Sequence, residues 1–263
     1  MTGLLITELA SGILRLTLND PATRNSLSEA MMAALQEALS EAALNPAVRV
    51  IVIAATGPAF SSGHNLKEIT AHRADADKGE AYFTTLFRAC AGLMAAIVRH
   101  PKPVIAEVRG LASAAGCQLV ASCDLAVAAD TAGFCTPGVN IGLFCSTPMV
   151  ALSRDVAPKH AMEMLLTGDI VSAADAARIG LINRVVSPNM LSEAVAELAH
   201  KIASKSQMTI KMGKAAFHGQ QGLSLEDAYA LTARVMAENL LTRDAEEGIG
   251  AFVAKRQARW TDQ

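Results

Sequence analysis

Hydrophobic and polar positions near the start of the chain follow two different periods, which predicts a β-hairpin followed by a helix. Apolar residues partly alternate over residues 4–18, with Ser11-Gly12 as the turn between two strands. Over residues 27–39 they recur at helical spacing. Ser26 and Glu29 have the spacing of a capping box at the beginning of this helix.

Strands and helices continue to alternate as far as residue 186. Residues 48–54 are nearly all apolar, as expected of a strand that is covered on both faces. Such alternation is typical of right-handed βαβ units and predicts an α/β fold. Further helices are expected at 82–98, 116–122, 160–166 and 173–179, and further strands at 104–108, 125–128 and 181–186.

After Pro188 the pattern becomes purely helical. Three helices are expected, at 188–204, 206–219 and 223–258, the last with a break near Thr242. Their apolar stripes are too extensive for a monomer to cover, and exposed apolar patches of that size mark interfaces. We therefore expect residues 1–200 to form the α/β core and residues 201–263 to form a helical oligomerisation region.

Composition and charge exclude several classes of protein. The chain is 51% apolar with a net charge of −2, which excludes disorder and gives no basic footprint for nucleic acid. The longest uncharged run, residues 131–153, is interrupted by proline and glycine, so it does not predict a membrane span. No signal or transit segment is recognisable at the N-terminus, and we expect a cytoplasmic protein.

Five cysteines are present, and their spacing indicates neither a redox motif nor a metal site. No CxxC pair and no metal-ligand spacing with histidine occurs. We expect no metal, and we expect reduced, buried thiols at Cys90, Cys117, Cys123, Cys135 and Cys145.

Two loops rich in small residues are the candidates for chemistry. Residues 59–68 follow the 48–54 strand, and residues 109–118 follow the 104–108 strand; each leads into a helix. Free N–H groups at helix N-termini favour a negative oxygen. Two such loops at neighbouring strand ends either form tight connections only or aim two N–H groups at one point as an oxyanion hole.

Several motifs together make the chain resemble the enoyl-CoA hydratase/isomerase (crotonase) superfamily along its whole length. The resemblance implies a crotonase-like spiral of ββα/βαβ units with a C-terminal helical region that builds trimers, often paired into hexamers. It also implies an acyl-CoA thioester ligand from fatty acyl-CoA metabolism. The motifs are residues 21–27, 60–67, 110–124, 173–181 and 251–256.

The resemblance assigns the oxyanion hole and exposes a departure from the family. The thioester carbonyl would be polarised by the backbone N–H groups of His64 and Ala115. Hydratases of the family use two glutamates as general base and acid, and the matching positions here are Gln118 and Gly138. Glutamine cannot exchange a proton and glycine offers no side chain, so poor hydration is expected.

Three functions therefore stay open. The chain is an enzyme that works through an enolate with an unidentified proton donor, or a non-catalytic acyl-CoA-binding protein, or a thioesterase or decarboxylase. Residues 140–142 resemble a loop of superfamily decarboxylases, but Cys145 stands where those enzymes carry tyrosine. Cys145 is a candidate nucleophile, with a buried small residue as the alternative, and the His64 side chain is a candidate that either faces the hole or points away.

Basic residues at family positions are expected to hold the CoA nucleotide. The resemblance places Arg24, Lys67 and, across a subunit boundary, Lys255 near this end of the ligand. Asn65 and Leu66 would line the adenine and pantetheine through backbone contacts. No cofactor beyond the CoA thioester is expected.

Three carboxylates near these loops have structural roles in our interpretation. Glu68 is expected to face solvent or a neighbouring subunit, and Asp124 to cap backbone at the head of a strand. Glu107 lies on a core strand, where a buried carboxylate must be paired or neutral. We expect Arg109 on the same strand to be its partner.

Overall fold

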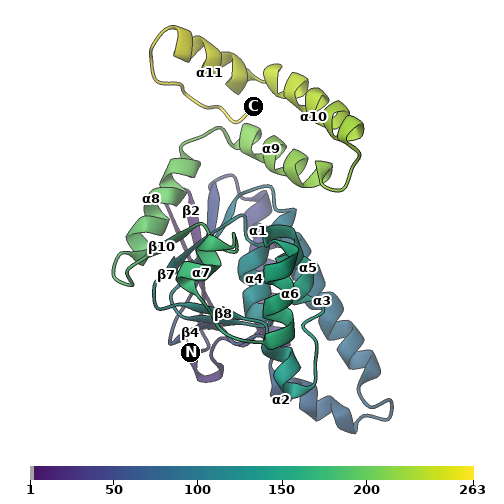
Figure 1. The fold of residues 1–263 in the computed structure, drawn as a ribbon. Coiled ribbons are helices and arrows are strands. Elements are labelled where there is room, and N and C mark those ends of the chain that lie inside the picture. The colour runs from purple at the N-terminus through teal and green to yellow at the C-terminus, as the bar shows by residue number, and fades with distance from the viewer. Residues whose placement is uncertain (1–2) are drawn as a thin grey trace.

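Two β-sheets organise the first part of the chain in the computed structural model, which describes residues 3–263 (Figure 1). The larger sheet has the order β1-β2-β3-β5-β7-β10 and is parallel except for β1, which pairs antiparallel with β2. The smaller sheet has the order β4-β6-β8-β9. The strands are β1 (Leu5–Ala10), β2 (Ile13–Leu18), β3 (Val50–Ala55), β4 (Ala59–Ser61), β5 (Val104–Val108), β6 (Leu111–Ser113), β7 (Leu125–Ala129), β8 (Gly133–Cys135), β9 (Val171–Ser172) and β10 (Arg184–Val186).

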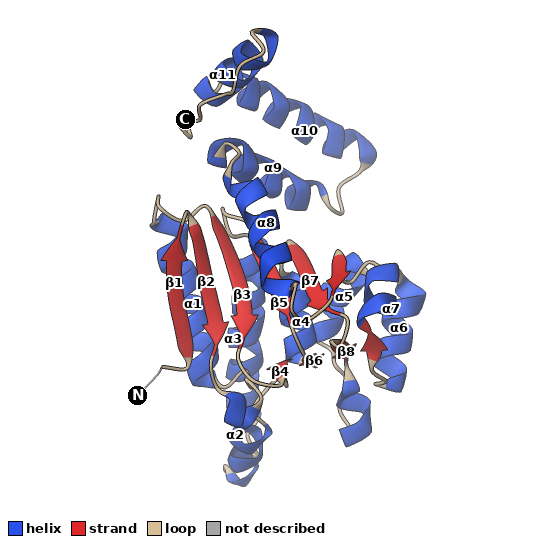
Figure 2. Cartoon of the chain, turned by 90° about the vertical axis from the view of Figure 1, so that its left-hand side faces the viewer, coloured by secondary structure: helices blue, strands red, loops and turns tan. Residues whose placement is uncertain are grey.

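Helices cover both faces of the larger sheet, so the chain has the predicted α/β architecture. On β3, Val50 and Val52 pack with α8, whereas Ile51 and Ile53 face the core that contains α1, α3 and α4. Figure 2 shows α8 lying across the sheet. The helices are α1 (Glu29–Leu44), α2 (Leu66–Ala71), α3 (Glu80–Val98), α4 (Ala115–Ser122), α5 (Pro148–Asp155), α6 (Pro158–Thr167), α7 (Ala173–Arg178), α8 (Leu191–Ala203), α9 (Gln207–Gln220), α10 (Leu225–Leu240) and α11 (Arg243–Val253).

The N-cap of the first helix, α1, lies two residues later than the predicted N-cap, Ser26. Ser28 is the N-cap, and its hydroxyl accepts a hydrogen bond from Met31 N at 3.2 Å. Ser26 instead contacts the hydroxyl of Thr23. The prediction of a Ser26–Glu29 box was wrong because a second serine two residues on was equally able to cap.

Short elements account for most other differences from the predicted pattern. β4 and β6 lie within the two segments that were expected to be loops, and α5 begins within the uncharged run and ends two residues beyond it. The predicted 181–186 strand is reduced to β10 because Leu181 and Ile182 turn into the core. Strands of three residues are too short to show a period of two, and they form here through pairing with neighbours.

Helix α3 is the most apolar long helix of the structure. Its 19 residues meet the length and hydropathy of a membrane-spanning helix. One face of the helix packs into the main core through five buried residues, Leu86, Cys90, Leu93, Met94 and Ile97. This packing explains the apolar composition of that face.

The last three helices stand apart from the sheets, at one end of the molecule (Figures 1 and 2). Helix α9 has no buried residue and neither has α10. Lys214 on α9 ties this region to the core through a 2.6 Å ion pair with Asp124. The chain passes from the sheet-packed α8 to α9 at residues 204–206, close to the predicted division near residue 200, and that division stays a prediction.

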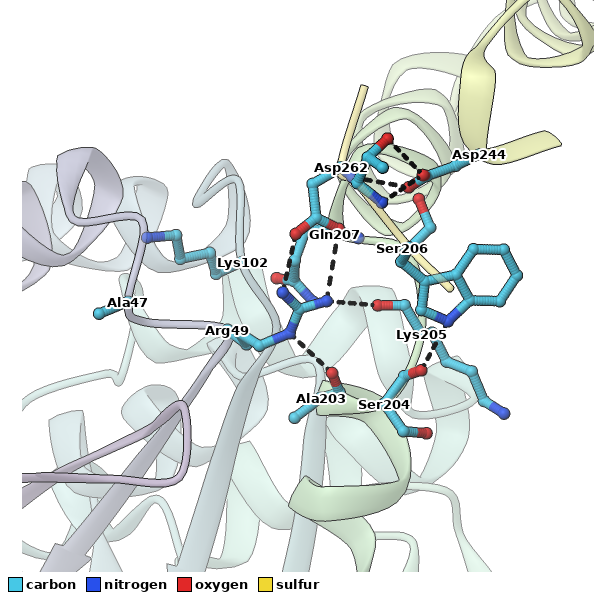
Figure 3. A network of polar contacts seen from close by, with 12 residues as sticks. Ala47, Arg49, Lys102, Ala203, Ser204, Lys205, Ser206, Gln207, Asp244 and Asp262 are labelled. Carbon is cyan, nitrogen blue, oxygen red and sulfur yellow. Dashed lines mark hydrogen bonds and ion pairs between the residues drawn. The ribbon is translucent and has the colours of Figure 1, made fainter. Parts of the chain in front are cut away.

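The C-terminal tail holds the helical region at its root (Figure 3). Asp262 accepts hydrogen bonds from Arg49, at 2.7 Å, and from Gln207 N, at 2.7 Å. Arg49 also donates to the carbonyl oxygens of Ala203 and Lys205. The tail therefore joins the start of β3 to the segment between α8 and α9.

Asp244, which is 1% exposed, fixes the tail against the first turn of α11. Burial by itself raises the pKa of this carboxyl, but hydrogen bonds from Ser206, from Thr261 and from the backbone of Asp262 outweigh burial and lower it. Because the pKa of Asp244 is lower in the folded state, its ionised carboxylate stabilises the fold. This stabilisation is complete above the ordinary pKa of aspartate and is lost as the pH falls through the lowered pKa of Asp244.

We predict that Asp244→Asn lowers the free energy of unfolding at pH 7 by about 2 kcal/mol, because charged hydrogen bonds are lost. The difference from the unsubstituted protein should be smaller at a second, acidic pH below the lowered pKa of Asp244, where this carboxyl is itself protonated. Urea titrations at both pH values measure this, with Glu226→Gln on the exposed surface of α10 as the matched control. An equal difference at both pH values would contradict the assignment.

Candidate functional site

The two loops identified in the sequence meet in the structure. β4 leads through Gly63 to His64 and α2, while β6 leads through Ala114 to Ala115 and α4. A Cβ atom on Gly63 would lie 3.1 Å from the backbone nitrogen of Ala115 and 3.0 Å from the carbonyl oxygen of Ser113. Gly63 also has a φ of +86°, so both its conformation and its closeness to the second loop require glycine.

Backbone pairing leaves the N–H groups of His64 and Ala115 without partners. Leu27 N donates to the carbonyl oxygen of Gly63 at 2.8 Å, and Leu27 and His64 form an isolated parallel bridge. Ala115 is the first residue of α4, where an N–H has no intrahelical acceptor. Within residues 3–263 neither N–H donates a hydrogen bond. Two unengaged donors on touching loops have the arrangement that an oxyanion hole needs.

Asn25 supports the first loop, a role that sequence reasoning missed. It is completely buried, and its side-chain nitrogen donates to the carbonyl oxygens of Thr56 and Ala59 at 2.7 and 2.9 Å. Its side-chain oxygen accepts from Asp20 N. The signal was its place in the motif at residues 21–27, but two of its three partners lie more than 30 residues away, and only the fold reveals these two.

Gln118 lies in the interior of α4, close to the second loop. It is 3% exposed, and its side-chain oxygen contacts Cys90 Sγ at 3.9 Å. Gln118 can position a group through its amide, but it cannot exchange a proton.

Gly138 is crowded as well as lacking a carboxylate. It lies in a 3₁₀ helix at residues 137–141, where a Cβ atom would be 2.7 Å from the carbonyl oxygen of Leu143 and 2.9 Å from Cys145 Sγ. Its φ is not positive. Any side chain at this position is therefore resisted by its neighbours, and not by the conformation of its own backbone.

Cys145 fills part of the space beside Gly138. It is 8% exposed, and burial raises the pKa of its thiol, an effect that the backbone of Gly138 partly offsets. A protonated, buried thiol is a poor nucleophile, so the structure favours the buried small residue over the nucleophile. In the part of the chain that the structure describes, no group of three histidine, cysteine or acidic side chains is arranged to hold a metal ion.

The imidazole of His64 lies against α3. Its ring packs edge-to-face on Phe87, with centroids 5.4 Å apart. Burial lowers the pKa of His64, and the backbone of Leu27 offsets this only in part. Neither ring nitrogen has a partner with hydrogen-bond geometry among the described residues. The ring is therefore neutral at pH 7.

Four of the five residues expected to bind CoA lie near the first loop. The carbonyl oxygen of Arg24 accepts from Ser62 N at 3.0 Å, and Asn65 caps α2 by accepting from Lys67 N at 3.0 Å. Leu66 is 52% exposed, and Arg24 and Lys67 are exposed as well. Lys255 follows the C-cap of α11. In both views α11 lies at the end of the molecule opposite to α2 (Figures 1 and 2).

The three carboxylates have structural partners, one of which differs from the prediction. Glu107 binds Arg15 on β2 with both oxygens, at 2.7 and 2.8 Å, and not Arg109, which donates to the carbonyl oxygen of Pro188. Asp124 accepts from Val104 N, as expected. Glu68 is half-buried and accepts from the backbone N–H of residue 29 at the start of α1, where solvent or a neighbouring subunit was expected.

Comparison with known proteins identifies the class to which this fold and site belong. The family model described as enoyl-CoA hydratase/isomerase matches residues 8–263. The mitochondrial enoyl-CoA hydratase domain-containing protein 3 of Xenopus laevis is 49% identical over 260 residues, covering 99% of this chain and 87% of that protein. The chain therefore belongs to the enoyl-CoA hydratase/isomerase family.

Solved structures agree with this assignment. A crystal structure of an enoyl-CoA hydratase from Mycobacterium smegmatis superposes with a TM-score of 0.94 at 48% identity and covers 98% of this chain and 99% of its own. The human enoyl Coenzyme A hydratase domain-containing protein 3 gives a TM-score of 0.94 at 47% identity, covering 98% of this chain and 100% of that one. The predicted crotonase-like fold is confirmed.

The expectation of a cytoplasmic protein is wrong by the same comparison. Relatives from Xenopus laevis, Rattus norvegicus and Homo sapiens, 48–49% identical, are all named mitochondrial. The expectation depended on the lack of a recognisable signal or transit segment at the N-terminus. The names of the relatives outweigh that absence.

Proposed function

We propose that this protein binds acyl-CoA thioesters and polarises the thioester carbonyl between the backbone N–H groups of His64 and Ala115. The observation that carries the proposal is the contact of the two loops with both donors unengaged. Preorganised N–H groups at such a point stabilise an enolate or a tetrahedral adduct of a thioester. No cofactor beyond the CoA thioester is required for this role.

The CoA nucleotide is assigned to the basic residues near the first loop. Arg24 and Lys67 are exposed there, beside Asn65 and Leu66. Lys255 is too far from them within one chain, so it would serve the site of a neighbouring subunit. Charged donors of this kind suit the phosphates of CoA.

The reaction of this site is enolate chemistry on an acyl-CoA rather than efficient hydration. Gln118 and Gly138, at the positions matched to the two hydratase glutamates, cannot transfer protons. The second candidate, a non-catalytic acyl-CoA-binding protein, is favoured by the crowding at Gly138, where no carboxylate is accommodated. A thioesterase or decarboxylase of the same superfamily remains the third.

Oligomerisation through the C-terminal helices follows from their exposed apolar surface. Phe217 on α9 is 60% exposed, and Phe252 on α11 is 85% exposed. Patches of this kind mark an interface, and a trimer or a hexamer of two trimers is expected. Multi-angle light scattering at micromolar concentration measures the state, and a monomer at that concentration would refute the expectation.

Isothermal titration calorimetry with acetyl-, crotonyl- and longer acyl-CoAs tests the proposed ligand. Binding of at least one of these thioesters is expected, and Arg24→Ala and Lys67→Ala should each weaken it. Lys159→Ala, on the exposed surface of α6, is the matched control and should leave binding unchanged. If no thioester in the panel binds, the proposed function fails.

A further inference from the structure

His64 carries a second, unexplained feature besides its backbone N–H. Both ring nitrogens are buried, and neither has a hydrogen-bond partner among the described residues. A buried polar group without a partner costs about 1–3 kcal/mol. The fold tolerates this cost at a residue that also forms one side of the proposed oxyanion hole.

His100 shows how the same fold treats a structural histidine. It is 4% exposed, and both of its ring nitrogens have partners. Nε2 lies 3.0 Å from the carbonyl oxygen of Leu39, and Nδ1 accepts from Lys102 N at 3.1 Å. Burial alone therefore does not explain the unpartnered ring of His64, which points to a partner that comes from outside the chain.

The surroundings of the His64 ring place it with the other groups of the site. Phe87 holds the ring on α3, and Cys90, three residues further along α3, contacts the side chain of Gln118. His64 and Gln118 thus lie over neighbouring turns of one helix, beside the two unengaged N–H groups. No charged side chain shifts the pKa of His64.

We infer that the His64 imidazole is the proton-transfer group of this site and acts on C2 of the bound acyl thioester; this rests on the proposed function. A neutral ring nitrogen takes the C2 proton, and the electron pair of the C2–H bond forms the C1–C2 double bond. The thioester oxygen becomes an enolate oxygen between the N–H groups of His64 and Ala115. The protonated ring exchanges this proton with solvent, and return of a solvent-derived proton from the same nitrogen to C2 restores the thioester. Phe87, which is 38% exposed, must move to admit the acyl group.

Exchange of the C2 protons in D₂O tests this directly. With butyryl-CoA as the probe, the unsubstituted protein should introduce deuterium at C2, detected by mass spectrometry. His64→Ala keeps the backbone N–H and removes the ring, so the exchange rate should fall by about 10²–10⁴-fold while calorimetric binding persists. His160→Ala, at a half-buried histidine on α6 whose side chain is 41% exposed, is the matched control and should exchange as the unsubstituted protein does.

A second variant separates proton transfer from positioning and guards against misfolding. His64→Gln keeps a polar side chain that can hydrogen-bond but cannot exchange a proton, so it should lose exchange as His64→Ala does. Exchange that persists in either variant overturns the inference. So does butyryl-CoA that binds the unsubstituted protein without exchanging, which leaves the proposed function intact; absence of binding overturns both.

Discussion

Crotonyl-CoA should be hydrated by this protein orders of magnitude more slowly than by a family member with glutamates at both matched positions. Each general acid–base group contributes about 10²–10⁴-fold to rate, and Gln118 and Gly138 supply neither group. Loss of the enoyl thioester absorbance, followed at saturating crotonyl-CoA, measures the rate. Rapid hydration by the unsubstituted protein would show that the positions are wrongly matched or that another group does this work.

Restoring the carboxylates should succeed at one position and fail at the other. Gln118→Glu is nearly isosteric, so the fold should survive, although burial will raise the pKa of the new carboxyl. Gly138→Glu places a Cβ atom within 2.7 Å of the backbone oxygen of Leu143, so the loop must shift and stability should fall. The single variant Gln118→Glu is therefore the useful test of a hydration rate increase, with Gln118→Ala as its control. If Gly138→Glu is as stable as the unsubstituted protein, the claim that neighbouring atoms exclude a side chain at this position is wrong.

Glu107→Ala should lower the free energy of unfolding by about 3 kcal/mol, because it leaves Arg15 without its partner. Glu107 is 4% exposed and is also bonded by the hydroxyl of Ser192 on α8 at 2.9 Å. The bidentate hydrogen bond to Glu107 is the main cause of the raised pKa of Arg15. Chemical denaturation followed by circular dichroism measures the loss.

A double-mutant cycle distinguishes the two arginines that compete for Glu107. Arg15→Ala combined with Glu107→Ala should show strong coupling, whereas Arg109→Ala should add independently. Arg109 is exposed and makes one hydrogen bond, to the carbonyl oxygen of Pro188. Coupling of Glu107 to Arg109 instead of Arg15 would reverse the assignment made from the structure.

The long elements were predictable because each carries its own period. The strand predicted at 48–54 corresponds to β3 at 50–55. The unbroken apolar run of β3 reflects cover by α8 on one face and α1 on the other. For the same reason, the helices predicted at 188–204, 206–219 and 223–258 correspond to α8, to α9 and, on the two sides of the break near Thr242, to α10 and α11, although α11 ends at residue 253 and not at 258. A period is a local property, so it needs no knowledge of the fold.

Features that depend on distant residues were not predictable in this way. Arg15 on β2 aligns with Val52 on β3, and Val52 aligns with Ile105 on β5. Glu107 lies two residues beyond Ile105 on the same face of β5, so its side chain meets that of Arg15, 92 positions away in the sequence. Sequence reasoning chose a neighbour on the same strand because strand order was unknown. At the site, the motifs located His64 and Ala115, but the unpartnered ring of His64 is a property of its surroundings.

The central claim is that the N–H groups of His64 and Ala115 polarise a bound thioester carbonyl, and its most direct test is the ¹³C NMR shift of [1-¹³C]butyryl-CoA on the protein. Polarisation should move the carbonyl resonance downfield from its position in free butyryl-CoA. Gly63→Ala, which forces a Cβ atom to within about 3 Å of the second loop, should abolish this displacement. A bound thioester whose carbonyl resonates at the position of the free ligand would contradict the account.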